Sequence, residues 1–143
     1  MPDHTTTPAT TPATPMPQPS MYPVLDPKTP LDHATALLRA GQCALAIMAK
    51  APRPGKVKTR LAPPLTLEQS AALNISFLSD TAQNIADIAD TGCAVGLLSY
   101  TPIGDEALFD DLLPPEFALI PQRGDDFGER LLAAAEDILA CGY

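Results

Sequence analysis

The sequence has few cysteines and few basic residues, and both shortages limit what the protein can be. The three cysteines are odd in number and widely spaced, with no Cys-x-x-Cys pair, so neither a disulfide framework nor a zinc site is predicted. Nine Lys and Arg residues stand against 17 Asp and Glu residues, for a formal net charge of −8. Such an acidic chain is not expected to offer nucleic acid or an anionic membrane a general binding surface, so any anion site must be local.

Long apolar runs are also lacking. The longest, from Cys43 to Ala49, is strand-sized and well short of the about 18 residues that span a bilayer. The N-terminus has neither the basic start and apolar stretch of a secretion signal nor the arginines of a transit peptide. We therefore expect a cytoplasmic protein without a membrane segment, and its length of 143 residues predicts one domain with a modest core.

The N-terminal part of the chain is rich in proline. The first 30 residues contain nine of the 17 prolines within a Thr/Pro/Ala pattern. Proline lacks a backbone donor, and this composition cannot support a packed core, so residues 1–27 are predicted to be a disordered tail. Residues 28–42 are predicted to hold a short helix, with Thr29 as N-cap and Gly41 at its end.

From residue 43 onward, strand, loop and helix patterns alternate three times. Strands are predicted at 43–48, 93–100 and 117–120, the first covered on both faces, and helices at 66–92, 105–113 and up to Gly142. The helix predicted at 66–92 begins with a capping box. The last helix carries an apolar stripe made of Leu131, Leu132, Ala135, Ile138 and Leu139. The predicted fold class is α/β, a Rossmann-like and mostly parallel sheet with flanking helices.

A helix with no strand after it would leave one sheet edge exposed and the helix half uncovered. We therefore expect residues 43–143 to be the N-terminal part of a larger domain that stops after the third β-α unit. Ligands of parallel sheets bind beyond the carboxyl ends of the strands, which directs attention to the loops at 50–64 and 121–128.

The first of these loops concentrates positive charge. It holds five of the nine basic residues and no acidic one: Lys50, Arg53, Lys56, Lys58 and Arg60. Arginine forks and lysine point charges bind phosphate, and prolines with Gly55 bend the loop, so a diphosphate is the natural guest. The alternative is a solvated basic loop without a ligand.

Other phosphate motifs and catalytic constellations are not found. Gly55-Lys56 is followed by Val57, and Lys50 occupies the place of the first glycine of a P-loop; there is no Gly-x-Gly-x-x-Gly either. No side chain stands out as a nucleophile or general base, so the catalytic residues are not assigned.

Two segments carry a family resemblance. Residues 49–61, Ala-Lys-Ala-Pro-Arg-Pro-Gly-Lys-Val-Lys-Thr-Arg-Leu, closely resemble the signature of a bacterial glycosyltransferase-A-like (GT-A-like) family of radical-SAM/selenoprotein-associated transferases. Residues 122–131 are similar to its second motif, Gly-Asp-Leu-Gly-Glu-Arg, although Asp125 replaces a glycine and Phe127 a leucine. The resemblance covers about residues 43–143, the first half of the family domain. The stretch from Lys58 to Leu61 is also similar to the first loop of 2-phospholactate guanylyltransferases.

The resemblance implies a GT-A-like sheet that binds a nucleotide sugar or nucleoside triphosphate, with Mg or Mn in the complete domain. The positions that match the two motifs, and so are implied to bind nucleotide or phosphate, are Lys50, Arg53, Gly55, Lys58, Thr59, Arg60, Gln122, Gly128, Glu129 and Arg130. Glu129 and Arg130 have a structural alternative, in which they stabilise the first helical turn. The family's Gly-x-Asp-x-Pro acidic motif has no counterpart in these residues, so no metal ligand is expected in this chain.

The leading functional hypothesis is therefore a glycosyltransferase-like enzyme domain. Lys58 and Arg60 would neutralise the charge that grows on a departing nucleoside diphosphate. Nucleotidyl transfer of the guanylyltransferase type is the alternative reaction, and a non-catalytic nucleotide-binding module or an inactive remnant is the alternative class. RNA binding is disfavoured because no aromatic residue interleaves the basic loop.

Overall fold

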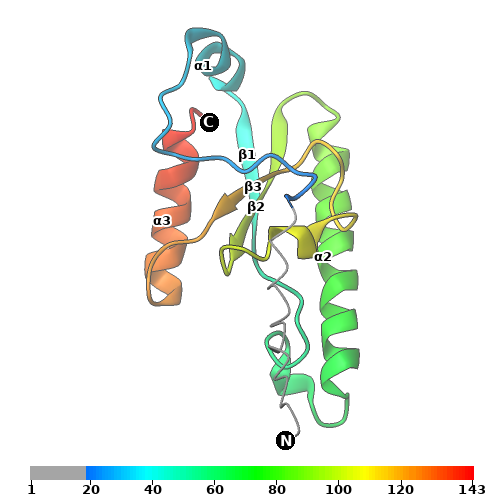
Figure 1. Ribbon diagram of the computed structural model, residues 1–143. Coiled ribbons are helices and arrows are strands. Elements are labelled where there is room, and N and C mark those ends of the chain that lie inside the picture. Colours follow the sequence, from blue (N-terminus) through cyan, green and yellow to red (C-terminus); the bar gives the residue numbers. More distant parts are fainter. Residues whose placement is uncertain (1–18) are drawn as a thin grey trace, which may run out of the picture.

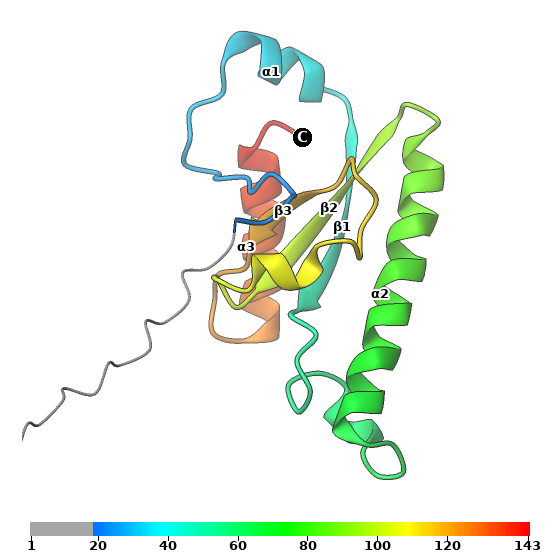
Figure 2. The same cartoon turned by 45° about the vertical axis from the view of Figure 1, so that its right-hand side comes forward.

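A three-stranded parallel sheet organises the protein. The computed structural model describes residues 19–143. The strands β1 (Cys43–Lys50), β2 (Ala94–Thr101) and β3 (Ala118–Pro121) lie side by side in that order. Helix α2 (Leu67–Ala89) covers one face of the sheet and α3 (Phe127–Ala140) lies against the other (Figures 1 and 2). This arrangement confirms the predicted α/β, Rossmann-like fold class.

Helix α2 begins where its capping box predicts. The Thr66 hydroxyl accepts from the backbone N–H of Gln69, and the Gln69 side chain accepts from the N–H of Thr66. These two bonds satisfy donors that the first helical turn leaves without partners. Ala71, Leu78 and Ala82 are buried toward the sheet, as their helical spacing predicts.

The core lies between α2, the sheet and the loop after β2. Leu98 and Tyr100 of β2 pack there with Phe109, whose ring meets that of Tyr100 edge to face at 6.0 Å between centroids. Phe109 belongs to the short 3-10 helix η2 (Glu106–Phe109), where a helix over 105–113 was predicted. That prediction was wrong because Asp111 adopts a left-handed φ of 62° and interrupts the helical path.

The disordered tail predicted at 1–27 includes residues that are part of the fold. Residues 1–18 of it lie outside the described part of the chain, but residues 19–27 contact the sheet. The Tyr22 side chain is buried, and its hydroxyl donates to the carbonyl oxygen of Leu113 at 2.6 Å. Pro23 and Leu25 exchange backbone hydrogen bonds with Leu119, so this segment covers the outer edge of β3. Proline-rich composition did not prevent this pairing, because the segment around Val24 has apolar side chains and because the backbone N–H of Leu25 and the carbonyl of Pro23 are available to Leu119.

The predicted helix at 28–42 is shorter than expected. Helix α1 spans His33–Arg39 and is capped by Asp32, whose carboxylate accepts from the N–H of Thr35. Thr29 is instead part of a turn in which its N–H donates to the carbonyl of Asp26. Asp32 rather than Thr29 is the N-cap, because its backbone is extended and its carboxylate reaches the first turn of α1.

The predictions for the burial of β1 and for the buried face of α3 were also wrong. β1 is an edge strand whose side chains are partly or fully exposed, and is not covered on both faces. In α3, the buried residues are Ala133, Ala134 and Asp137, whereas the leucines of the predicted stripe face outward. Two alanines and Asp137 of α3 are therefore the buried residues, and the leucine stripe is left without a partner among the described residues.

Candidate functional site

Two hollows flank the carboxyl end of β1, one toward α2 and the other toward α3. The α2-side hollow has a volume of about 390 Å³ and is lined by Ile47, Met48, Ala49, Lys50, Lys56, Val57, Lys58, Asn74, Phe77, Leu78 and Thr81. Three of these residues are lysines from the predicted basic loop. Val57 is buried beneath the loop and anchors it. The hollow therefore combines positive charge at its rim with apolar side chains below.

Lys58 is held beside this hollow. Its ammonium lies 5.8 Å from the centroid of the Phe77 ring on α2, within the range of a cation–π contact. Its backbone adopts a left-handed φ of 49° immediately before the 3-10 helix η1 (Thr59–Leu61). Thr59 and Arg60 follow in η1 and are exposed.

The α3-side hollow has a volume of about 210 Å³. Its lining residues are Met48, Ala49, Lys50, Thr101, Gln122, Asp125, Phe127 and Arg130. It thus brings the end of β1 together with the second predicted motif. Asp125 adds an acidic group to a hollow that otherwise carries Lys50 and Arg130.

Lys50 belongs to both hollows and is the link between the two predicted motifs. Lys58 and Arg60 lie farther along the loop, which extends beyond the strand ends toward the start of α2 (Figures 1 and 2). Gln122 and Arg130 lie on the α3 side. The ten predicted positions therefore do not converge on a single cavity. Lys58 lines one hollow, Gln122 and Arg130 line the other, Lys50 lines both, and the other six positions line neither.

Arg53 already has an acidic partner. Its guanidinium makes a bidentate pair with Asp105, with Nε to Oδ2 at 2.8 Å and Nη2 to Oδ1 at 2.6 Å. The hydrogen bond from Arg53 lowers the pKa of the Asp105 carboxyl below its usual value. The pair ties the loop after β1 to the loop after β2. Gly55, with φ of 75°, makes the turn between Arg53 and Lys58.

Gln122 holds the strand ends together. Its side-chain amide donates to the carbonyl of Ser99 at 2.7 Å and to that of Ala49 at 3.3 Å, and its backbone N–H donates to Tyr100. A primary amide has two N–H donors, and both are used here. Gln122 therefore positions the end of β1, and its predicted role as a phosphate donor has no free N–H in this conformation.

The remaining second-motif residues shape the start of α3. Asp126 is the N-cap and accepts from the N–H of Glu129, and the Glu129 carboxylate accepts from the N–H of Asp125. Arg130 donates from Nε to the carbonyl of Gly124 at 3.0 Å. These bonds match the structural alternative for Glu129 and Arg130, in which they stabilise the first helical turn.

The glycines of this motif differ in what they require. A Cβ on Gly124 would lie 2.9 Å from the Cβ of Glu129, and its φ is 109°, so only glycine fits. A Cβ on Gly128 would lie 3.3 Å from the Asp126 carboxylate, which is a milder conflict. Sequence reasoning singled out Gly128 and passed over Gly124.

Ser99 lies in the middle strand at this end of the sheet and has a buried hydroxyl with no hydrogen-bond partner. We expect Ser99→Ala to raise the free energy of unfolding by about 1 kcal/mol, because it removes a buried polar group that is not satisfied. Urea denaturation measures this. Ser70 is a matched control: it is equally buried, but its hydroxyl donates to the carbonyl of Thr66, so Ser70→Ala should destabilise. A loss of stability in both variants would contradict the prediction.

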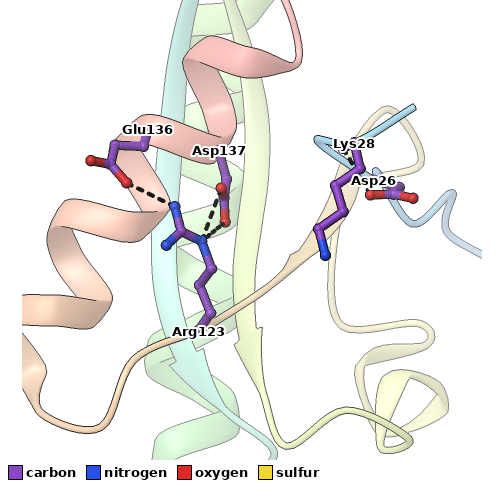
Figure 3. A network of polar contacts seen from close by, with 5 residues as sticks. All are labelled: Asp26, Lys28, Arg123, Glu136 and Asp137. Carbon is purple, nitrogen blue, oxygen red and sulfur yellow. Dashed lines mark hydrogen bonds and ion pairs between the residues drawn. The ribbon is translucent and has the colours of Figure 1, made fainter. Parts of the chain in front are cut away.

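Ion pairs also attach the loop after β3 to the C-terminal half of α3. Arg123 donates to Asp137 from Nε at 2.9 Å and to Glu136 from Nη2 at 2.7 Å (Figure 3). The hydrogen bond to Asp137 is the main cause that raises the pKa of Arg123, followed by that to Glu136. Since Asp137 is buried on α3, this network fixes the loop against the helix that follows it.

Residues that sequence reasoning missed come from elements interpreted only for packing. Asn74, Phe77 and Thr81 reach the α2-side hollow from α2, whose pattern indicated only its apolar face. Asp105 was taken as the start of a helix, and it pairs with Arg53 instead. The sequence shows basic residues in the loop after β1 and acidic residues after β2, but charge alone does not specify that Arg53 pairs with Asp105.

Residues 19–143 contain no group of three or more His, Cys, Asp or Glu side chains that is placed to hold a metal ion. No helix in the same range combines the length and apolar character needed to cross a membrane.

Comparison with known proteins gives two similarities. Residues 84–143 match the model of a family described as an uncharacterised protein conserved in bacteria (DUF2064). The fold is similar to the crystal structure of a candidate nucleotide-diphospho-sugar transferase from Desulfovibrio desulfuricans G20, with a TM-score of 0.60 and 31% sequence identity. That match covers 73% of this chain and 44% of the other. No curated protein matches the chain.

The two similarities differ in how much of the chain they cover. The family match covers only the end of α2, together with β2, β3 and α3, and the structural match extends over most of the described residues. This chain spans less than half of the length of the protein that it resembles. Taken together, the similarities show that this chain shares its fold with part of a candidate nucleotide-diphospho-sugar transferase.

Proposed function

We propose that the protein binds the diphosphate of a nucleotide sugar at the carboxyl end of β1, as part of a glycosyltransferase-like domain. The observation that carries the proposal is the position of Lys50, which lines both hollows and lies between the basic loop and the second motif. Carboxyl ends of parallel strands are where α/β proteins bind their ligands. The transferase-like neighbour is consistent with a nucleoside diphosphate as the ligand.

The cations differ in how available they are. Lys50, Lys56 and Lys58 lie at the rim of the α2-side hollow, and no ion pair to any of them occurs among the described residues. Arg53 is already neutralised by Asp105. We therefore assign phosphate binding to the lysines and a positioning role to Arg53, which holds the loop that carries Lys56 and Lys58.

In a transfer reaction these lysines would act electrostatically. As the bond to the sugar breaks, negative charge grows on the departing nucleoside diphosphate, and preorganised ammonium groups stabilise that charge. The apolar floor made by Ile47, Phe77 and Leu78 would exclude water from one side of the ligand.

A binding titration tests the proposal. The 143-residue chain is titrated with uridine and guanosine diphosphate sugars and with nucleoside triphosphates, with and without Mn²⁺, by calorimetry. We expect Lys58→Ala to weaken the best ligand about tenfold or more, because a charged hydrogen bond contributes about 1.5–3 kcal/mol. Lys50→Ala should have at least the same effect, since Lys50 faces both hollows.

Arg53→Ala is the matched control. It removes a cation from the same loop, but that cation is paired, so affinity should fall less than it does in Lys58→Ala. Equal losses in the two variants would mean that loop charge alone attracts the ligand. Absence of binding by any nucleotide would contradict the proposal, and preference for triphosphates over diphosphate sugars would favour nucleotidyl transfer.

A further inference from the structure

A third hollow lies on the β3 side of the sheet, between α3 and the N-terminal segment that pairs with β3. This β3-side hollow has a volume of about 650 Å³ and is lined by residues 26–28, Ile103, residues 121–123, Asp137 and Ala140. It is larger than either hollow at the end of β1, and its volume is within the range of pockets that bind small molecules. The function proposed above does not use it.

Lys28 places a positive charge on one wall of this hollow. Its side chain extends from the segment at 26–28 into the space that separates that segment from Arg123 and α3 (Figure 3). No ion pair to its ammonium occurs among residues 19–143. Asp26 lines the hollow too, but its carboxylate already accepts from the backbone N–H of Lys28 at 2.9 Å and from the Thr29 hydroxyl at 3.3 Å. The ammonium is therefore available to an anionic group of a ligand.

The α3 wall has an excess of negative charge. There the single guanidinium of Arg123 is shared between two carboxylates, those of Glu136 and Asp137 (Figure 3). Of these two, Asp137 lines the hollow, and it is only 8% exposed. Its two oxygens accept from Nε of Arg123 at 3.1 and 2.9 Å, and each carboxylate oxygen can accept a second hydrogen bond. This wall is therefore suited to a cationic donor.

Apolar side chains complete the lining. They are Pro27, Pro121 and Ala140, together with Ile103 from the loop after β2, whose side chain is 73% exposed. In pockets that combine apolar walls with a few polar groups, the apolar part of the ligand supplies contact area and the polar groups fix its orientation. The ligand that matches this hollow therefore has an anionic group, a cationic group and an apolar part.

We propose that the β3-side hollow binds a small zwitterion with an apolar side chain, of the class of the free α-amino acids. The ligand carboxylate pairs with Lys28, its ammonium donates to Asp137, and its side chain covers Ile103. An ion of one sign fits less well, because it leaves the charge of one wall without a partner.

A titration with matched ligands tests the proposal. Leucine is compared with three compounds that each lack one of its parts: isocaproate has no ammonium, isoamylamine has no carboxylate, and glycine has no apolar side chain. Binding to the 143-residue chain is followed through amide chemical shifts. We expect leucine to bind with a dissociation constant of about 1 mM or lower and to shift the amides of Lys28, Ile103 and Arg123. Each of the other three should bind about tenfold more weakly or worse, because a charged hydrogen bond or an apolar contact is lost.

Two variants assign the charges to their walls. Lys28→Met should weaken leucine about tenfold and leave isoamylamine unchanged, since that ligand has no carboxylate for Lys28 to bind. Asp137→Asn should weaken leucine by a similar factor and leave isocaproate unchanged, since that ligand has no ammonium. Glu116→Gln is the control: it removes an exposed carboxylate just before β3, outside this hollow, and should not affect leucine.

The proposal is rejected if leucine causes no saturable shifts at these residues, if any of the three other compounds binds as tightly as leucine, or if Lys28→Met leaves the affinity for leucine unchanged. Because Asp137 is buried and paired, the melting temperature of Asp137→Asn is measured first. If that variant is unfolded, the ligand series and Lys28→Met decide the outcome. Nucleotide binding is an independent result, since the lysines of the α2-side hollow do not line this one.

Discussion

Gly96→Ala is expected to lower the free energy of unfolding by about 3 kcal/mol, at the upper end of what overpacking costs. A Cβ at this position in β2 would lie 2.2 to 2.7 Å from three atoms of the Phe117 ring. Phe117 is almost fully buried, so a shift of its ring would disturb its packing with the core. Urea denaturation followed by circular dichroism gives the change, and the melting temperature should fall by about 10 °C.

A double variant separates this clash from a general loss of strand stability. Phe117→Leu removes the ring atoms that meet the new Cβ, so Gly96→Ala should cost much less in that background than in the native chain. Additive losses in the double variant would show that the methyl group does not contact Phe117. The cycle also tests the packing at the end of the sheet opposite to the candidate site.

The second large effect is expected for Tyr22→Ala, with a loss of about 3–5 kcal/mol. Tyr22 is buried, and its hydroxyl both donates to the carbonyl and accepts from the N–H of Leu113. Alanine leaves a cavity and two buried backbone groups without partners. Stability is measured by urea denaturation, and hydrogen exchange at Leu119 shows whether residues 23–25 detach from the sheet edge.

Two companion variants make this prediction specific. Tyr22→Phe keeps the ring and removes only the hydroxyl, so about 1–3 kcal/mol should be lost. Met21→Ala changes the adjacent residue, whose side chain is 59% exposed, and should alter stability little. If all three variants are as stable as the native chain, residues 20–25 contribute nothing to the fold.

The sequence predicts the fold class because hydrophobic periodicity reports local structure. The capping box at Thr66 and the strand patterns at 93–100 and 117–120 depend on neighbours in the chain, and the structure has this cap and strands at Ala94–Thr101 and Ala118–Pro121. The position of residues 20–25 could not be predicted, because their partners are about 90 positions away in sequence. The stripe on α3 was misassigned because periodicity tells which side chains share a face and does not tell which face meets the sheet.

The candidate site was predictable in its loops and less so in its contacts. The parallel topology places both loops at the carboxyl edge, which the sequence indicates. Whether a side chain is free to bind a ligand depends on its contacts with other loops and strands. Arg53 is paired with Asp105, and the Gln122 amide donates to carbonyl groups of the strands. Such pairings arise in three dimensions, and no spacing rule predicts them.

The pairing of Leu25 with Leu119 also bears on the order of events during synthesis. Residues 20–25 leave the ribosome well before their partner strand, which lies about 90 positions later in the chain. Until then the apolar side chains of Tyr22 and Leu25 have no native contact, and closing so long a loop slows assembly. Of the three described strands, β3 is therefore the last to be made, and until it is made the segment at 20–25 stays unpaired and prone to aggregation.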